Sequence, residues 1–156
     1  MKIFKTAKEI IDCLVDYHYR AARLAEEAMD REQEERVEVV FNYLFEHHSD
    51  MQEALVDFEA DNEGEDDVFS AEVDYGLNAG DAPEAFLSDF EMDENMAFDA
   101  VEKLGRALGD YPAEFLGNLL GELSEPNVAE AFGNLLDLER SEQRKLTRAI
   151  NSLRDM

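Results

Sequence analysis

The chain has 156 residues, of which 45% are apolar and 34% are charged, and its formal net charge is −25. This composition predicts one folded domain, residues 1–156, and argues against a disordered chain. Fourteen basic residues against 39 acidic ones argue against nucleic acid or an anionic membrane as a partner. Two interpretations of the acidity stay open: a surface for a basic partner protein or for cations, or the solvated surface of a salt-adapted protein.

The single cysteine, Cys13, excludes a disulfide framework within the chain and a cysteine-based zinc or iron–sulfur site. No apolar run reaches the roughly 18 residues that indicate a membrane span. The first residues, MKIFKTAKEI, lack the apolar core of a signal peptide. We therefore expect a cytoplasmic protein that does not associate with membranes.

Helical periodicity and start signals predict four long helices and a short one. The sequence TAKE from Thr6 to Glu9 has the spacing of a capping box, and so does DAPE from Asp81 to Glu84. An acidic stretch over about 59–81 contains three glycines and has no helical period, which predicts a long loop. The predicted helices cover about 7–30, 34–59, 82–108, 113–123 and 126–153.

This order of elements predicts an all-α fold, a four-helix bundle with a long crossover between the second and third long helices. The short helix over 113–123 is expected between the third and fourth long helices, after an interruption at the sequence GDYP. Apolar residues recur at alternating spacings of three and four, which favours near-antiparallel helix packing.

Two of the three histidines lie on the apolar stripes of the first two helices. One stripe reads Ile11, Leu14, His18, Ala21, Ala25 and Ala28, and the other reads Val37, Phe41, Leu44, His48, Met51, Leu55 and Phe58. In an antiparallel hairpin that turns near residue 33, positions whose numbers average 33 lie at the same level, as His18 and His48 do. His47 is expected on the flank of its helix, because adjacent helical residues point about 100° apart.

Three glutamates interrupt the stripes of the last two long helices. Glu139 and Glu142 are one turn apart in the last helix, and Glu94 lies on one possible stripe of the helix over 82–108. The numbers of Glu94 and Glu142 average 118, inside the segment that joins these helices, so the two could share a level. A second register stays open for residues 82–108, with Phe86, Phe90, Asp93, Ala97 and Ala100 inward, and it leaves Glu94 outside.

A carboxylate in an apolar core costs several kcal/mol unless it is protonated, paired or bound to a metal. Imidazole and carboxylate together suit iron, manganese or zinc, so the sequence predicts a metal site. Its predicted ligands are His18, His48, Glu94, Glu139 and Glu142. Open coordination positions could take oxygen, peroxide or a small substrate. The alternative is a pair of core histidines that are hydrogen-bonded to Glu139 or Glu142.

In architecture the chain resembles the ferritin-like superfamily, which includes the rubrerythrins and bacterioferritins. The resemblance implies a di-iron or di-manganese site with one Glu from each of two helices and a Glu-x-x-His pair from each of the other two. Here LERSEQ gives Glu139-x-x-Glu142, FEHH gives Phe45-x-x-His48, and His18 stands where a Glu is expected. Glu94 matches the family pattern. These departures leave open one metal ion, an altered pair or no metal.

Three function classes follow. The first is a metal-binding ferritin-like bundle, a candidate oxidoreductase. The second is a metal-free, degenerate ferritin-like bundle that acts as a binding module. The third is an unrelated acidic all-α protein that engages a basic partner protein. The resemblance also implies a homodimer, because ferritin-like bundles often pair.

Overall fold

The structure is a computed structural model that describes residues 4–31, 34–62, 68–74, 82–90 and 96–155. The described residues confirm the all-α fold class, with a 3₁₀ turn and a very small sheet in addition to the helices. The helices are α1 (Ala7–Arg31), α2 (Glu35–Asp61), α3 (Pro83–Ser88), α4 (Phe98–Leu120) and α5 (Pro126–Ser152). The 3₁₀ turn covers Val68–Ser70, and the strands are β1 (Phe4–Thr6) and β2 (Glu72–Asp74).

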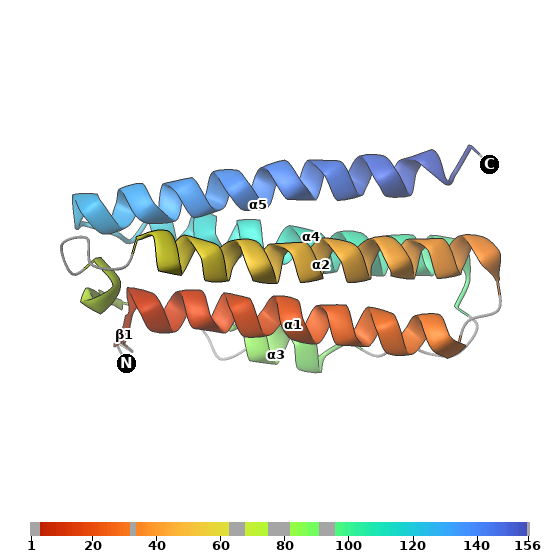
Figure 1. Cartoon of the computed structure of the whole chain (residues 1–156), viewed down its shortest axis with the longest axis horizontal. Coiled ribbons are helices and arrows are strands. Elements are labelled where there is room, and N and C mark those ends of the chain that lie inside the picture. The colour runs from red at the N-terminus through yellow and green to blue at the C-terminus, as the bar shows by residue number, and fades with distance from the viewer. Residues whose placement is uncertain (1–3, 32–33, 63–67, 75–81, 91–95, 156) are drawn as a thin grey trace.

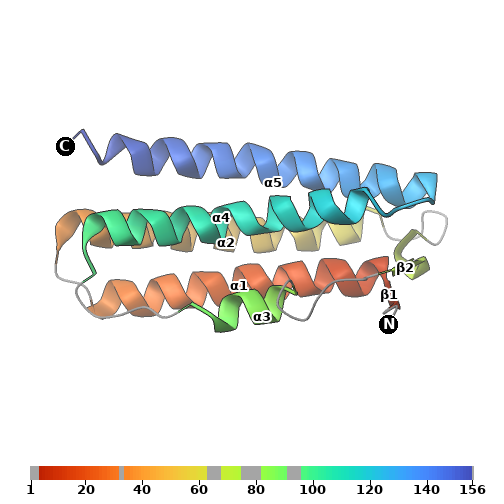
Figure 2. The ribbon, with the colours of Figure 1, turned by 180° about the vertical axis from the view of Figure 1, so that it is seen from behind.

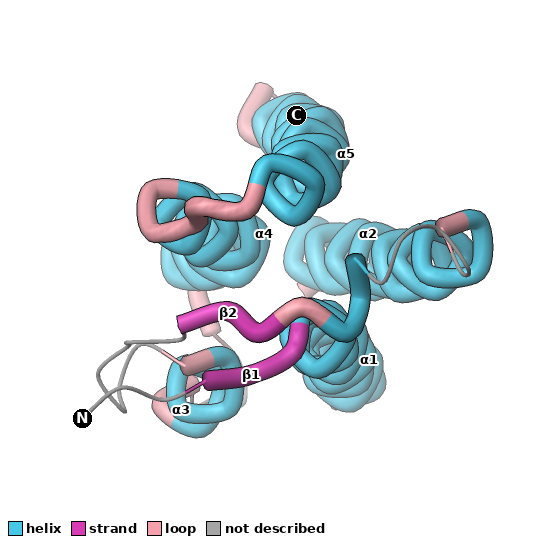
Figure 3. The backbone as a smooth tube through the Cα atoms, turned by 90° about the vertical axis from the view of Figure 1, so that its left-hand side faces the viewer, coloured by secondary structure: helices cyan, strands magenta, loops and turns pink. Residues whose placement is uncertain are grey.

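The four long helices, α1, α2, α4 and α5, lie side by side along the length of the molecule (Figure 1). α1 packs mainly against α2, α4 packs mainly against α5, and α2 also contacts both α4 and α5. α1 and α2 run in opposite directions, and so do α4 and α5, whereas α2 and α4 run in the same direction (Figure 2). Viewed along their axes, the four helices occupy the corners of a quadrilateral, and α3 lies outside it against α1 (Figure 3).

The predicted starts of the first and last helices are confirmed. The backbone N–H of Glu9 donates to Oγ1 of Thr6 at 3.1 Å, and the N–H of Thr6 donates to Oε1 of Glu9 at 3.1 Å. This reciprocal pair is a capping box, and it satisfies two of the donors that a helix start leaves free. At the start of α5, Pro126 occupies the first turn, where its missing N–H costs no helical hydrogen bond.

The helix predicted over 82–108 is wrong. α3 ends at Ser88, and α4 begins at Phe98 and continues through Pro112 to Leu120. The short helix therefore precedes the third long helix, and the segment predicted as a separate helix over 113–123 belongs largely to α4. Proline removes the N–H that would bond to the carbonyl of residue 108. The hydroxyl of Tyr17 donates to that carbonyl, Leu108 O, at 2.6 Å. The carbonyl therefore has a hydrogen-bond donor although the helix continues through Pro112.

The predicted loop over 59–81 is regular in part. β2 pairs with β1 in an antiparallel sheet, in which Lys5 lies opposite Val73. The N–H of Ala7 continues this pairing by donating to Ala71 O at 2.9 Å, and Val73 is 3% exposed. The long connection between α2 and α4 is thus attached to the start of α1. The predicted cap residue Asp81 lies outside the described residues.

The core consists of two apolar clusters that follow one another along the helices. One contains the first half of α1, the end of α2, most of α4 and the start of α5. The other contains the end of α1, the first half of α2, the start of α4 and the end of α5. On α2 the boundary falls between Leu44 and Met51, and on α5 it falls between Leu136 and Leu146. None of the helices among the described residues combines the length and apolar character needed to cross a lipid bilayer.

Candidate functional site

Four polar side chains occupy the boundary between the two apolar clusters, and we call them the polar layer. They are His18 of α1, His47 and His48 of α2, and Glu139 of α5. His18 and His48 are fully buried, and Glu139 is 1% exposed. Three helices therefore bring imidazole and carboxylate groups together in the interior, where each needs a polar partner.

Hydrogen bonds join three members of the polar layer in a chain. Nε2 of His18 lies 2.7 Å from Oε1 of Glu139, and Nδ1 of His18 lies 2.8 Å from Nδ1 of His48. A carboxylate only accepts, so His18 donates to Glu139 through Nε2–H. One of the two facing Nδ1 atoms carries a hydrogen and donates it to the other. The level predicted from the hairpin for His18 and His48 is confirmed.

His47 belongs to this layer, and its predicted position on the flank is wrong. Its side chain is 8% exposed, and its ring centroid lies 4.7 Å from that of His48 and 6.2 Å from that of His18. The missed signal is a second stripe on α2, since Val40, Leu44, His47 and Met51 also follow a 4–3–4 spacing and the other three are fully buried. The buried face of α2 is thus wide enough for two adjacent histidines.

Three buried atoms of the polar layer have no hydrogen-bond partner within the described part of the chain. They are Nε2 of His47, Nε2 of His48 and Oε2 of Glu139. A buried polar atom without a partner costs about 1–3 kcal/mol. Their occurrence in one layer indicates that the hydrogen-bond chain uses only part of the available donor and acceptor capacity.

Burial keeps the histidines of α2 in their neutral form. It lowers the pKa of His48 well below its usual range, with further contributions from His18 and His47. It also lowers the pKa of His47 to about 3, again with a contribution from His18. A neutral imidazole has a free electron pair on one ring nitrogen, which is the form that binds a metal ion.

The structure separates the two glutamates of the last helix. Glu139 is in the polar layer, but the side chain of Glu142 is 24% exposed and forms an ion pair with Lys145 at 2.8 Å. Glu142 is thus half-buried beside a surface lysine. Glu94 lies outside the described residues. Gln143, next to Glu142, donates a hydrogen bond to Asp110. Asp110 of α4 therefore lies at the level of Gln143 along the bundle.

The polar layer brings two imidazole nitrogens, Nδ1 of His18 and Nδ1 of His48, face to face. Within the residues described, no three or more His, Cys, Asp or Glu side chains are arranged to hold a metal ion. The two Nδ1 atoms at 2.8 Å are slightly too close for ligands of one ion, which lie about 2.0–2.1 Å from the metal and about 3.0–3.4 Å from each other. A metal site would need these nitrogens to move apart by a few tenths of an ångström, the hydrogen between them to move to Nε2 of the ring that carries it, and further ligands.

Comparison with known proteins gives no family. No family model matches the chain, and no curated protein or solved structure matches it significantly.

Proposed function

We propose that the polar layer binds one first-row divalent metal ion, with Nδ1 of His18 and Nδ1 of His48 as protein ligands. The observation that supports this proposal most is that the two Nδ1 atoms face each other at 2.8 Å. Glu139 already holds the His18 ring from its other side, through Nε2. A ligating histidine usually donates its second N–H to a carboxylate, which fixes the ring and strengthens it as a ligand. The role assigned to Glu139 is therefore to orient His18.

The remaining coordination positions are assigned to water and to the free capacity of the layer. Nε2 of His47 has no hydrogen-bond partner among the described residues and is the candidate third protein ligand, whereas Glu139 stays on the far side of the His18 ring. Iron, manganese and zinc all accept such nitrogen and oxygen donors. A bound redox metal would supply reactivity toward oxygen, peroxide or a small substrate, as expected of an oxidoreductase.

A ferritin-like arrangement is the second part of the proposal. It is supported by the directions of the four long helices and by the long connection between α2 and α4 (Figures 1 and 2). Ferritin-like proteins also carry their metal ligands at mid-length on facing helices. The homodimer stays a prediction, which sedimentation equilibrium of the full chain tests.

Metal analysis of protein purified without chelators tests the site. We expect about one equivalent of metal in the wild type, strong loss in His48→Gln and retention in Glu142→Gln, which changes a carboxylate one turn from Glu139. Bound metal should also raise Tm, because it binds the folded state. Substoichiometric metal in all three proteins after incubation with Zn²⁺, Fe²⁺ or Mn²⁺ would contradict the proposal.

A second candidate function is a metal-free interaction module. It is favoured by the fact that both ring nitrogens of His18 already have protein partners, at 2.8 and 2.7 Å. The polar layer would then only fix the register of α1, α2 and α5. The net charge of −25 would be the functional feature, attracting a basic partner protein. For this function we expect a chain that takes up no metal and that binds a basic partner protein. Its affinity for that partner should fall steeply as the salt concentration rises.

A further inference from the structure

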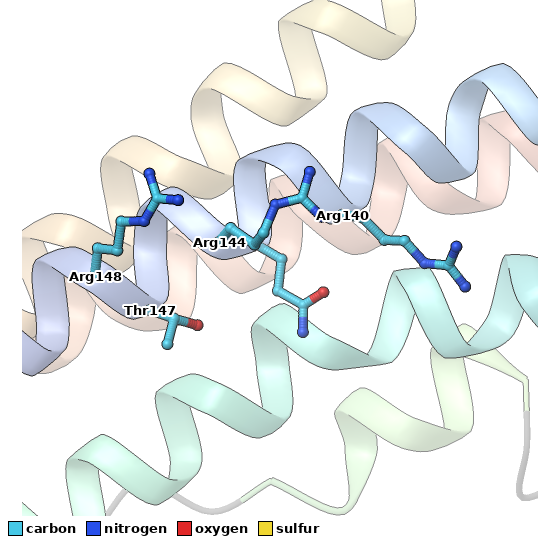
Figure 4. A pocket seen from close by; sticks show the side chains of 5 residues that line it. Arg140, Arg144, Thr147 and Arg148 are labelled. Atoms are coloured by element: carbon cyan, nitrogen blue, oxygen red, sulfur yellow. The ribbon is translucent and has the colours of Figure 1, made fainter.

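Three exposed arginines form a row along the surface of α5, on a strongly acidic protein. Arg140, Arg144 and Arg148 are one helical turn apart, and together with Gln143 and Thr147 they line a surface hollow of about 400 Å³. We call these three residues the arginine row. The side chains of Arg144 and Arg148 extend to the same side of α5, and Thr147 points toward α4 (Figure 4).

The arginine row is distinguished by the absence of partners. Within the described part of the chain, none of its guanidinium groups has an ion pair or a hydrogen bond. Every other arginine has an ion pair or a hydrogen bond. Because the chain has 39 acidic residues, acidic partners for arginine are abundant. The partnered arginines are Arg20, Arg23, Arg31, Arg36, Arg106 and Arg154.

The sequence of α5 keeps acidic residues away from Arg144 and Arg148, although Asp137 stands three positions before Arg140. The residues three and four positions from Arg144 are Arg140, Ser141, Thr147 and Arg148, and those around Arg148 are likewise basic or uncharged. Like charges at a spacing of four destabilise a helix, and a Glu at any of these positions would stabilise it. A purely structural helix in so acidic a chain gains nothing from this arrangement, which indicates a ligand.

We propose that the arginine row binds a small phosphate-bearing molecule. Guanidinium groups bind phosphate through two parallel hydrogen bonds, and the hydroxyl of Thr147 adds a donor in the hollow. Neighbouring arginines are about 6 Å apart along the helix, so two long side chains can reach one phosphate or the two groups of a diphosphate. A long polyanion is disfavoured, because beyond the row it would meet an acidic surface.

Titration calorimetry of the full chain with pyrophosphate and with inorganic phosphate tests this inference. We expect saturable binding with one site per chain and a higher affinity for pyrophosphate. The double variant Arg144→Gln, Arg148→Gln should lose about tenfold or more in affinity, since hydrogen bonds to charged groups are lost. Both side chains are exposed, so the variant should keep the helical circular dichroism of the wild type.

The matched control removes the same charge from α1. Arg20 and Arg23 are about half exposed and paired with Asp16 and Glu26, and the double variant Arg20→Gln, Arg23→Gln should bind pyrophosphate within about twofold of the wild type. Three results overturn the proposal. They are no saturable binding of either anion, equal losses in both double variants, or binding of poly-glutamate as tight as that of pyrophosphate, which would identify a surface for acidic peptides.

Discussion

His47 is the residue whose environment differs most from its expected one, and it makes stability depend on pH. Burial lowers its pKa in the folded state to about 3, against an unfolded value near 6.5. Between these values the unfolded state binds more protons, so acid favours unfolding. The contribution of His47 is fully present above pH 6.5 and is lost progressively as the pH falls toward 3.

We therefore expect His47→Leu to flatten the dependence of the free energy of unfolding on pH. The variant should gain relative to the wild type by up to about 1.4 kcal/mol for each pH unit below 6.5. Denaturant unfolding of metal-free protein at pH 7.5, 6.0 and 5.0 measures this difference. Glu59 has the opposite effect, because burial raises its pKa to about 7, but its contribution is common to both proteins and cancels. Parallel pH curves would show that the imidazole is not buried.

At the scale of the elements, α4 shows what local sequence rules cannot predict. α4 continues through Pro112, and the carbonyl of Leu108, which loses its helical donor there, accepts from the hydroxyl of Tyr17 in α1, 91 positions before Leu108. By contrast, the start of α1 was predictable, because its capping box lies within four residues. The register of His18 with His48 was predictable from hairpin geometry alone. The inward position of His47 and the separation of Glu142 from Glu139 depend on the width of each buried face, which the packing of neighbouring helices decides.

A double-mutant cycle tests the link between Tyr17 and Pro112. Tyr17→Phe removes the donor to Leu108 O, and we expect it to lower the free energy of unfolding by roughly 1–3 kcal/mol. In a Pro112→Ala background, the restored N–H of residue 112 can bond to the same carbonyl. The cost of Tyr17→Phe should then be smaller by about 1 kcal/mol, a coupling typical of groups that share a partner. Equal costs in both backgrounds would mean that the hydroxyl acts independently of the proline.

At the scale of the whole molecule, the polar layer and the surface charge work against stability in different ways. The layer has three buried polar atoms without a partner among the residues that the structure describes, and the chain carries a net charge of −25. The first cost is local, and the proposed metal would relieve it in part, through Nε2 of His47. The second is long-range self-repulsion, which is relieved by screening. Salt and metal should therefore stabilise the protein independently.

We expect Tm to rise when NaCl is increased from 10 to 150 mM, in the presence of a chelator. The Debye length falls from about 30 Å to about 8 Å over this range, so repulsion between distant carboxylates is screened first. Surface ion pairs such as Lys8–Asp12 and Arg20–Asp16 weaken as well, but each contributes about 1 kcal/mol or less. With 39 acidic and 14 basic residues, repulsion dominates the sum. Calorimetric scans in NaCl and in an uncharged osmolyte separate screening from solvent effects, and a Tm that falls with salt would show that ion pairs outweigh the net charge.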